Sequence, residues 1–346
     1  MDLDLSLKGY EVTTLSYDEI VIHELTKSTG NVMEIKRTGL NPSSEYEFDF
    51  GTVTTLERPG GKLLSTVVTL NDLHIGEKEC GVIHGVDTGP IFTSAEGEMQ
   101  YPEVMSRSAA DEIVEINPDV VIVKGDITAN GAESEFSLFD EIYGTKFGNR
   151  LHLTLGNHDK KSGSSFTVDP IEVVSLNGAL LVLVDTSLKD LPTGRISKEQ
   201  IGLISEIARS TTERVLVFGH HHPWDPSSRT RPENYFGICP DDSEVLVKVF
   251  ENNENMVGYF AGHTHRNRKR VFLPTKSVPF VEVAALKDYP GTYAEYRIFE
   301  EGIVQIHRRV SGKEALKWSE KCRGMYGGRY ADYAFGELED RCFTIC

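Results

Sequence analysis

Five short polar motifs constrain this 346-residue chain more than any other feature, because each of them follows a run of apolar β-forming residues. Such runs, for example residues 64–70 and 120–123, are typical of buried strands. One such motif would mean little, but five in this order, each at the end of a predicted strand, provide a complete ligand set for two metal ions. The motifs are Asp72-Leu73-His74, Gly125-Asp126, Gly156-Asn157-His158-Asp159, His220-His221-His222 and Gly262-His263-Thr264-His265.

The spacing of apolar residues predicts that strands and helices alternate from residue 64 to residue 260, and that a run of antiparallel strands follows residue 270. Ser197 and Gln200 form a capping box that marks the start of one helix. Asn117-Pro118 marks the end of another. The expected strands are 64–70, 120–123, 151–155, 179–184, 215–218, 256–260, 278–285, 293–299 and 303–307, and the expected helices are 103–116, 136–143, 197–208 and 244–250.

The two ends of the chain differ from this pattern. Near the N-terminus, residues 32–35 and 46–50 predict short half-buried strands. Leu40-Asn41-Pro42 before Tyr46 resembles the corner of a fibronectin type III sandwich, which would be truncated here. An independent module and a few strands packed on the main domain both remain open. We therefore predict a small β-rich segment at 1–60, a main α/β domain at 61–310, and a C-terminal tail at 311–346 without usable periodicity.

Composition narrows the classes of partner. The chain has 36 Lys and Arg residues against 53 Asp and Glu residues, a formal charge of −17, so we expect no nucleic acid polymer as partner. The densest basic cluster, residues 266–270, could attract one small anion. The chain has no apolar stretch of membrane-spanning length and no signal-peptide pattern, so we expect a cytoplasmic protein without a membrane partner.

Five cysteines make an odd count without a Cys-x-x-Cys spacing, which favours free thiols. Three of the five lie in the last 25 residues. A bridge from Cys322 to Cys342 or to Cys346 therefore stays open as an alternative.

Two metal ions a few ångströms apart need a bridging anion to offset their repulsion, and Asp126, on its tight Gly125 turn, is the natural protein bridge. Residues i and i+2 of the Asp-x-His and His-x-His pairs leave a strand end in similar directions, so both can reach the metal region. The mixture of carboxylate, amide and imidazole suits manganese, iron, zinc or cobalt. Without thiolate ligands, a purely structural zinc site is not expected.

The order and types of these residues resemble the calcineurin-like metallophosphoesterase superfamily, from about Leu64 to Arg308. The resemblance implies an α/β sandwich of two mixed β-sheets flanked by helices, with the site at the carboxyl ends of strands. It also implies hydrolysis of phosphate esters by in-line attack of a metal-bound hydroxide. Carried over motif by motif, it implies Asp72, His74, Asp126 and His265 for the first metal, and Asp126, Asn157, His221 and His263 for the second.

Four further assignments depend on this resemblance. His221, two residues before Pro223, holds the usual ligand position, with His220 as the alternative. His158 is expected near the leaving oxygen, where together with Asn157 it would bind substrate or would donate a proton, and Asp159 would orient it. Ala129 occupies the position of the metal-binding tyrosine of purple acid phosphatases, so no iron–tyrosinate colour is expected. His84 lies in the loop after the first motif, but we expect it to have no role in the site.

Three functions compete. The first is a phosphodiesterase acting on small molecules, resembling class III cyclic nucleotide phosphodiesterases and glycerophosphodiesterases. The second is a phosphomonoesterase, and the third a non-catalytic scaffold of the same fold. We expect a small-molecule phosphoester as the substrate. The sequence is also compatible with a homo-oligomer. The long, acidic segment 77–102 should overhang the metals and disfavour a doubly charged monoester, which favours a diester such as a cyclic nucleotide.

Overall fold

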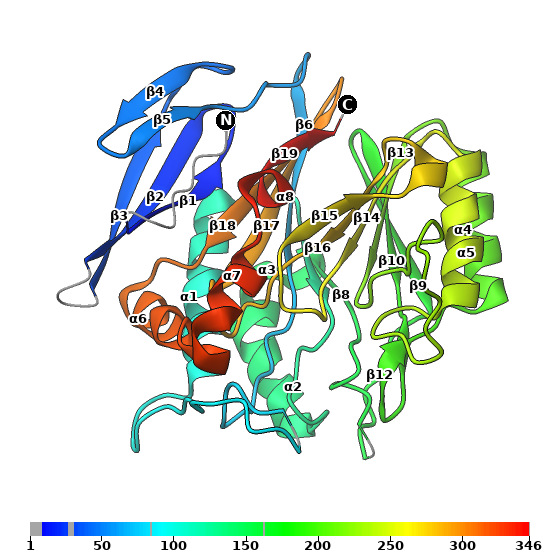
Figure 1. Cartoon of the computed structure of the whole chain (residues 1–346). Helices are drawn as coiled ribbons and strands as arrows, with labels where there is room; N and C mark the ends of the chain where they lie inside the picture. Colours follow the sequence, from blue (N-terminus) through cyan, green and yellow to red (C-terminus); the bar gives the residue numbers. More distant parts are fainter. Residues whose placement is uncertain (1–8, 27–30, 84, 162, 346) are drawn as a thin grey trace.

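The computed structural model describes residues 9–26, 31–83, 85–161 and 163–345. Its main body contains two six-stranded mixed sheets with helices on their outer faces (Figure 1). The predicted α/β sandwich with a small β-rich N-terminal part is confirmed. The first sheet has the order β19-β18-β17-β6-β7-β8, from Phe343–Ile345, Ile303–Arg309, Thr292–Phe299, Leu63–Leu70, Val120–Lys124 and Leu151–Thr154. The second has the order β15-β16-β14-β13-β10-β9, from Arg268–Val271, Pro279–Glu282, Met256–Ala261, Arg214–Gly219, Ala179–Val184 and Ile171–Leu176.

Parallel pairing in the centre of each sheet decides where the motifs end up. In the first sheet β6, β7 and β8 are parallel. In the second, β10, β13, β14 and β16 are parallel. All five motifs follow one of these strands, so each sheet brings its own motifs to one edge. A short hairpin of β11 (Ser187–Leu188) and β12 (Leu191–Gly194) lies outside both sheets.

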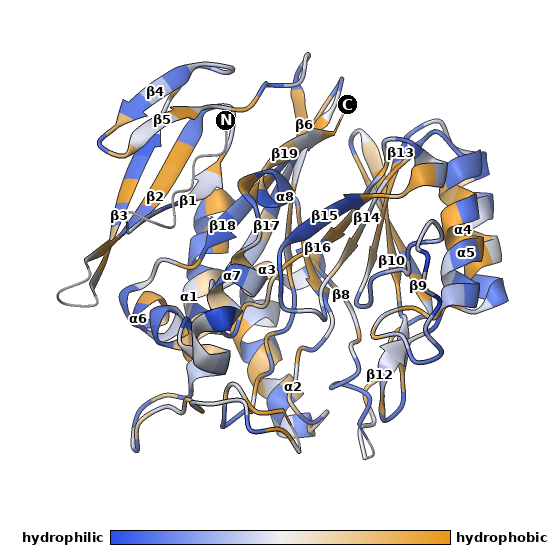
Figure 2. Ribbon diagram, in the orientation of Figure 1, coloured by the Kyte–Doolittle hydropathy of each residue, from blue (hydrophilic) through white to orange (hydrophobic). Residues whose placement is uncertain are grey.

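Apolar side chains between the sheets fix this arrangement. Ile122 of the first sheet and Leu181 of the second are fully buried in the layer that joins them. The ring of Tyr296 meets the rings of Phe260 and Phe218, with centroids 4.9 and 6.1 Å apart. Since the other face of each sheet is covered by helices, the central strands are largely apolar, as the orange strands of Figure 2 show.

The helices lie largely where the sequence predicts them. The first sheet is covered by α1 (Tyr101–Ile116) and α2 (Glu133–Phe139), which continues through a π-helical turn, η2 (Asp140–Gly144), into α3 (Thr145–Phe147). A short 3-10 turn, η3 (Gly148–Arg150), leads into β8. The second sheet is covered by α4 (Lys198–Ser210) and α5 (Pro240–Asn252). The predicted capping box is confirmed, because Ser197 and Gln200 bond reciprocally at 3.1 and 2.8 Å.

The N-terminal part contains more structure than the sequence predicts. It forms a three-stranded antiparallel sheet and a hairpin, and only the equivalents of β3 and β4 were expected. The Tyr46 hydroxyl accepts a hydrogen bond from the Asn41 backbone N–H at 2.7 Å, which pins the corner noted in the sequence. Ion pairs such as Arg308–Glu19 at 2.5 Å join this part to the main body. Its strands are Tyr10–Leu15, Glu19–Thr26, Asn31–Thr38, Glu45–Phe48 and Gly51–Thr54 (β1 to β5).

The C-terminal segment, in which periodicity predicted no element, is folded onto the main body. It forms α6 (Lys313–Cys322), α7 (Arg329–Phe335), α8 (Leu338–Arg341) and β19, the last of which extends the first sheet beside β18. Two 3-10 turns, Leu273–Thr275 (η4) and Met325–Gly328 (η5), complete the described elements. Trp318 of α6 stacks on Tyr101 of α1 with centroids 4.1 Å apart. The domain boundaries at 60 and 310 stay predictions.

The described cysteines are free thiols: Cys80, Cys239, Cys322 and Cys342. The alternative of a Cys322–Cys342 bridge is therefore wrong, and Cys346 lies outside the described residues, as does His84.

Candidate metal centre

The loops that follow five parallel strands meet where the two sheets approach each other. The first sheet contributes its residues from the ends of β6, β7 and β8, and the second from the ends of β13 and β14. Every residue predicted as a metal ligand lies in one of these loops. They are Asp72, His74, Asp126, Asn157, His221, His263 and His265, with His220 beside them.

The backbone of these loops is unusual. Ten non-glycine residues of the described chain have positive φ, and five of them are predicted ligands. This conformation costs of order 1–3 kcal/mol for a non-glycine residue and concentrates at functional sites. The strain is consistent with side chains that the fold aims at a common point. The five residues are Asp72, His74, Asp126, His263 and His265.

Two glycines let the loops approach closely. A Cβ atom on Gly125, which has a φ of +81°, would lie 2.7 Å from the backbone nitrogen of Gly156. A Cβ atom on Gly156 would lie 2.2 Å from Oδ1 of Asp126. With glycine at both positions, Asp126 Oδ1 accepts a hydrogen bond of 2.8 Å from the His158 backbone N–H. The two turns are thereby joined through the predicted bridging residue.

The other oxygen of Asp126 lies between two groups of donors. Oδ2 is 3.6 Å from His74 Nε2 and 3.3 Å from His220 Nε2. His74 belongs to a cluster with Asp72 and His265, whereas His220 belongs to a cluster with His221 and His263, and within each cluster the donor atoms lie within 4.8 Å of one another. A carboxylate oxygen placed between two such clusters has the position required of a bridge between two metal ions.

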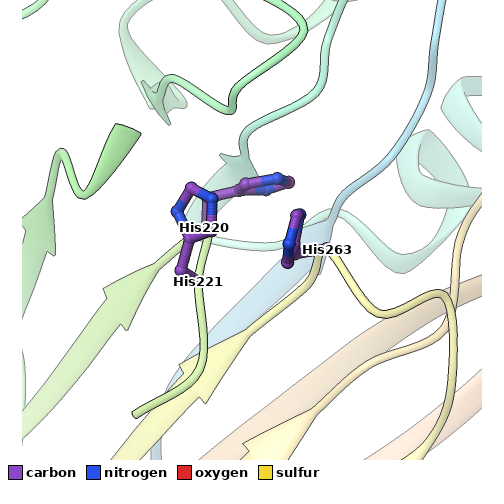
Figure 3. Close-up of side chains that lie close together, drawn as sticks. All are labelled: His220, His221 and His263. Atoms are coloured by element: carbon purple, nitrogen blue, oxygen red, sulfur yellow. The ribbon is translucent and has the colours of Figure 1, made fainter. Parts of the chain in front are cut away.

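Several donor atoms of these clusters are buried and have no hydrogen-bond partner among the described residues. They include His221 Nε2, His263 Nε2 and Asp72 Oδ1. A buried polar atom left unpaired costs about 1–3 kcal/mol, which metal coordination would offset. Figure 3 shows the imidazoles of His220, His221 and His263 converging from the two loops of the second sheet. The nitrogen and oxygen donors fit a pair of transition-metal ions.

Because these groups lie close together, the pKa values of some histidines are raised, whereas those of Asp126 and of the other histidines are lowered. Burial favours the neutral acid of Asp126, but His220 and His158 hold its pKa well below the usual range. Against the effect of burial, Asp126 raises the pKa of His220 to about 9, and Asp72 with Asp288 raises that of His265 to about 10. Burial and neighbouring imidazoles hold the pKa values of His221 and His263 well below 6.5. Anionic carboxylates and neutral imidazoles are the forms that bind metal.

Both histidines between which the sequence left a choice reach the centre. Nε2 of His220 lies 3.3 Å from Asn157 Oδ1, and its Nδ1 lies 2.8 Å from the carbonyl oxygen of Lys124. Nδ1 of His221 lies 2.8 Å from the Thr186 hydroxyl, and its Nε2 is the unpartnered atom noted above. The sequence favoured His221 as the metal ligand. Since both His220 and His221 can reach the second metal position, this assignment stays a prediction.

The expectation that Asp159 orients His158 is wrong. The buried carboxylate of Asp159 instead accepts hydrogen bonds from Gly156, Ile127 and Thr128 at 2.7–3.2 Å, and so ties the β7 and β8 turns together. Nδ1 of His158 faces the carbonyl oxygen of Ala129 at 3.0 Å. Four donors from two turns surround the Asp159 carboxylate, which accounts for its turning away from its neighbour in sequence.

The sequence pattern of the calcineurin-like phosphoesterases matches residues 65–267, more than half of the chain. The chain belongs to the calcineurin-like phosphoesterase family. This family uses a dinuclear metal centre, and the two donor clusters around Asp126 are the candidates for it here. Among the described residues, no helix is long and apolar enough to cross a membrane.

Distant relatives come from several bacteria. The chain is 25% identical over 277 residues to the probable glycerophosphodiester phosphodiesterase GpdQ of Arcobacter nitrofigilis, covering 74% of this chain and 99% of that protein. It is 24% identical over 217 residues to the 3',5'-cyclic adenosine monophosphate phosphodiesterase CpdA of Haemophilus influenzae, covering 61% and 72%. A crystal structure of a dimetal phosphatase from Danio rerio shares the fold, with a TM-score of 0.52 and 13% identity over 72% of this chain and 98% of that one.

Behind the first donor cluster of this metallophosphoesterase lies a buried charged network that sequence reasoning missed. Nδ1 of His74 is 3.0 Å from Glu77, and Nδ1 of His265 is 3.5 Å from Asp288. The ammonium of Lys287 joins these carboxylates, at 2.6 Å from Glu77 and 3.3 Å from Asp288. Carboxylates behind ligating histidines fix ring orientation and raise ligand basicity. Asp288 comes after the strand β16, just as the five motifs come after their strands. This position was the sequence signal that could have identified Asp288 as part of the site.

Two tyrosines complete this network. The hydroxyl of Tyr101 donates to Glu77 at 2.5 Å, and that of Tyr330 donates to Asp288 at 2.8 Å. Glu77 is thus an internal support of His74, whereas the sequence placed it among the acidic groups facing the substrate. Helices α1 and α7 therefore contribute to the orientation of the two histidines.

Replacing Lys287 with Met should weaken metal binding at one site about 10- to 100-fold, because the carboxylates behind His74 and His265 lose their common cation. Manganese titration followed by electron paramagnetic resonance measures both sites. Lys36→Met is the matched control, since it breaks the 2.8 Å Lys36–Glu19 pair in the N-terminal sheet. Unchanged affinity in Lys287→Met, or equal loss at both sites, would contradict a role in positioning these two histidines.

Proposed function

We propose that this metallophosphoesterase is a metal-dependent phosphodiesterase of small molecules, with cyclic nucleotides as leading candidates. The observation that carries the proposal is the pair of donor clusters around Asp126, in a chain whose bacterial relatives are phosphodiesterases of glycerophosphodiesters and cyclic nucleotides. The formal charge of −17 disfavours a nucleic acid polymer. Manganese, iron, zinc or cobalt would suit the donors.

The charge balance near the centre supports a diester. The guanidinium groups of Arg266 and Arg270 lie 2.9 and 3.6 Å from the buried carboxylate of Glu282. Conversely, Lys287 is a single cation between the two carboxylates of Glu77 and Asp288. Taken together, these three cations face three carboxylates and so offer little excess positive charge to a substrate. A phosphodiester carries one negative charge, whereas a monoester carries about two near neutral pH.

Two metal ions, when bound, supply a nucleophile at neutral pH and neutralise charge on the phosphate. Asn157 and His158 are the groups of this chain proposed to contact substrate, and both are half-buried at the end of β8. Because Nδ1 of His158 faces the Ala129 carbonyl, its N–H donates there and Nε2 is directed to other partners. The ring of His158 lies 4.4 Å from that of His74, between centroids. His158 is thus placed to bind the phosphate or, in its doubly protonated form, to donate the Nε2 proton to the leaving oxygen.

The substrate class is tested by comparing bis-nitrophenyl phosphate, nitrophenyl phosphate and cyclic AMP with the manganese-loaded protein. We expect kcat/KM for bis-nitrophenyl phosphate to exceed that for nitrophenyl phosphate at least tenfold, and we expect cyclic AMP to be hydrolysed. A preference for the monoester would contradict the proposal and favour a phosphatase. No turnover of any ester by the metal-loaded protein would favour a scaffold.

The role of His158 is tested by His158→Ala. General acid catalysis is typically worth about 10²–10⁴-fold, so kcat should fall by that factor for a diester with an alkoxide leaving group and much less for one with nitrophenolate. His152→Ala is the control, because His152 pairs with Glu172 at 2.7 Å and belongs to neither donor cluster. An equal loss with both leaving groups would assign His158 to phosphate binding.

A further inference from the structure

We propose that Phe236 and Tyr333 form a stacking surface, beside the metal centre, for a flat ring of the substrate such as a nucleobase. This inference rests on the proposed function, because it concerns the ester group carried by the phosphate. Both rings contact the loop 262–265, which carries the predicted ligands His263 and His265.

Phe236 contacts this loop from the segment between β13 and α5. Its ring lies nearly parallel to the imidazole of His263, with centroids 4.0 Å apart and an interplanar angle of 28°. The side chain nevertheless remains 54% exposed. A phenyl ring that covers a ligand candidate and still presents more than half of its surface to solvent offers an apolar face next to the metal ions.

The segment around Phe236 is fixed although it is a loop. On one side, the hydroxyl of Tyr235 lies 2.8 Å from Nε2 of His222. On the other, the backbone N–H of Ile238 donates to the His222 carbonyl at 2.9 Å. Both anchors belong to His222, directly after the predicted ligand position. The backbone on either side of Phe236 is therefore held in place before any substrate binds, which lowers the entropy cost of stacking.

Tyr333 reaches the same loop from α7 in the C-terminal segment. Its hydroxyl donates to the carbonyl oxygen of Thr264 at 2.9 Å, and its side chain is 45% exposed. The guanidinium carbon of Arg266 lies 5.3 Å from the centre of its ring, a cation–π distance. Beyond Arg266 the chain enters β15, the strongly hydrophilic edge strand in Figure 2.

The chemistry of this surface points to a planar, electron-rich ring. Base–aromatic stacking tolerates different bases, because every base has a flat face, and it is worth roughly 5- to 150-fold in binding. Exposed phenyl and phenol rings beside an anion-binding centre would bind the base of a nucleotide while the metals bind its phosphate. An alkyl ester such as glycerol would gain little from them.

AMP and ribose 5-phosphate, which differ in the base alone, provide a matched pair of inhibitors. We expect AMP to inhibit the manganese-loaded wild type about tenfold more strongly than ribose 5-phosphate does. Phe236→Ala should reduce this ratio to about twofold and leave inhibition by ribose 5-phosphate unchanged. Phe236→Tyr, which keeps a ring, should retain the ratio. Leu273→Ala is the control for loss of an exposed apolar side chain, since Leu273 is 79% exposed.

An unchanged ratio in Phe236→Ala, or no preference in the wild type, would overturn the stacking surface. Loss of manganese affinity in Phe236→Ala would also overturn it, because Phe236 would then only support His263. The ratio can be measured with any phosphoester that the wild type hydrolyses. A monoester preference would therefore end the diester proposal without deciding the stacking surface, so the two failures are distinguishable.

Discussion

The buried ammonium of Lys124 connects the strands on which the metal centre depends. Lys124 ends β7, and its Nζ donates to the carbonyl oxygen of Ala261, the last residue of β14, at 2.9 Å. Its own carbonyl oxygen lies 2.8 Å from Nδ1 of His220, directly after β13. Burial lowers the pKa of Lys124 to about 7, although Asp72 raises it. The side chain of Lys124 thus joins the ends of β7 and β14, its backbone carbonyl contacts the residue after β13, and the predicted ligands lie within a few residues of each strand end.

Around Lys124, further residues hold the predicted ligands in position. Asp126 is held by the turns around Gly125 and Gly156, and those turns are tied together by Asp159. The histidines of the first cluster rest on carboxylates joined by Lys287, which in turn contact helices α1 and α7. A ligand held from behind in this way loses little freedom when metal binds, and its geometry is set before the reaction. The strained backbone at five predicted ligand positions is the local cost of that preorganisation.

The sequence predicted those parts that local pattern specifies. Apolar runs followed by Asp, Asn or His located the strands and the loops of the centre, and the Ser197 capping box located a helix start. The sequence did not predict the roles of residues whose partners are distant along the chain. The role of Asp159 could not be read from its position beside His158, because three of the four donors to its carboxylate lie about 30 residues away. Helix α7 has only seven residues, too few for a periodicity of 3.6 residues to be visible, yet it carries Tyr330 and Tyr333. Glu77 and Lys287 are 210 residues apart, so only the fold reveals that they are joined.

The proposed function requires that Asp126 bridge two metal ions held by the two donor clusters. Anomalous diffraction from crystals of the manganese-saturated protein tests it most directly. We expect two peaks, one on either side of Asp126 Oδ2. The first should be bound by Asp72, His74 and His265, and the second by Asn157, His263 and either His220 or His221. A single peak, or two peaks of which only one contacts Asp126, would contradict it.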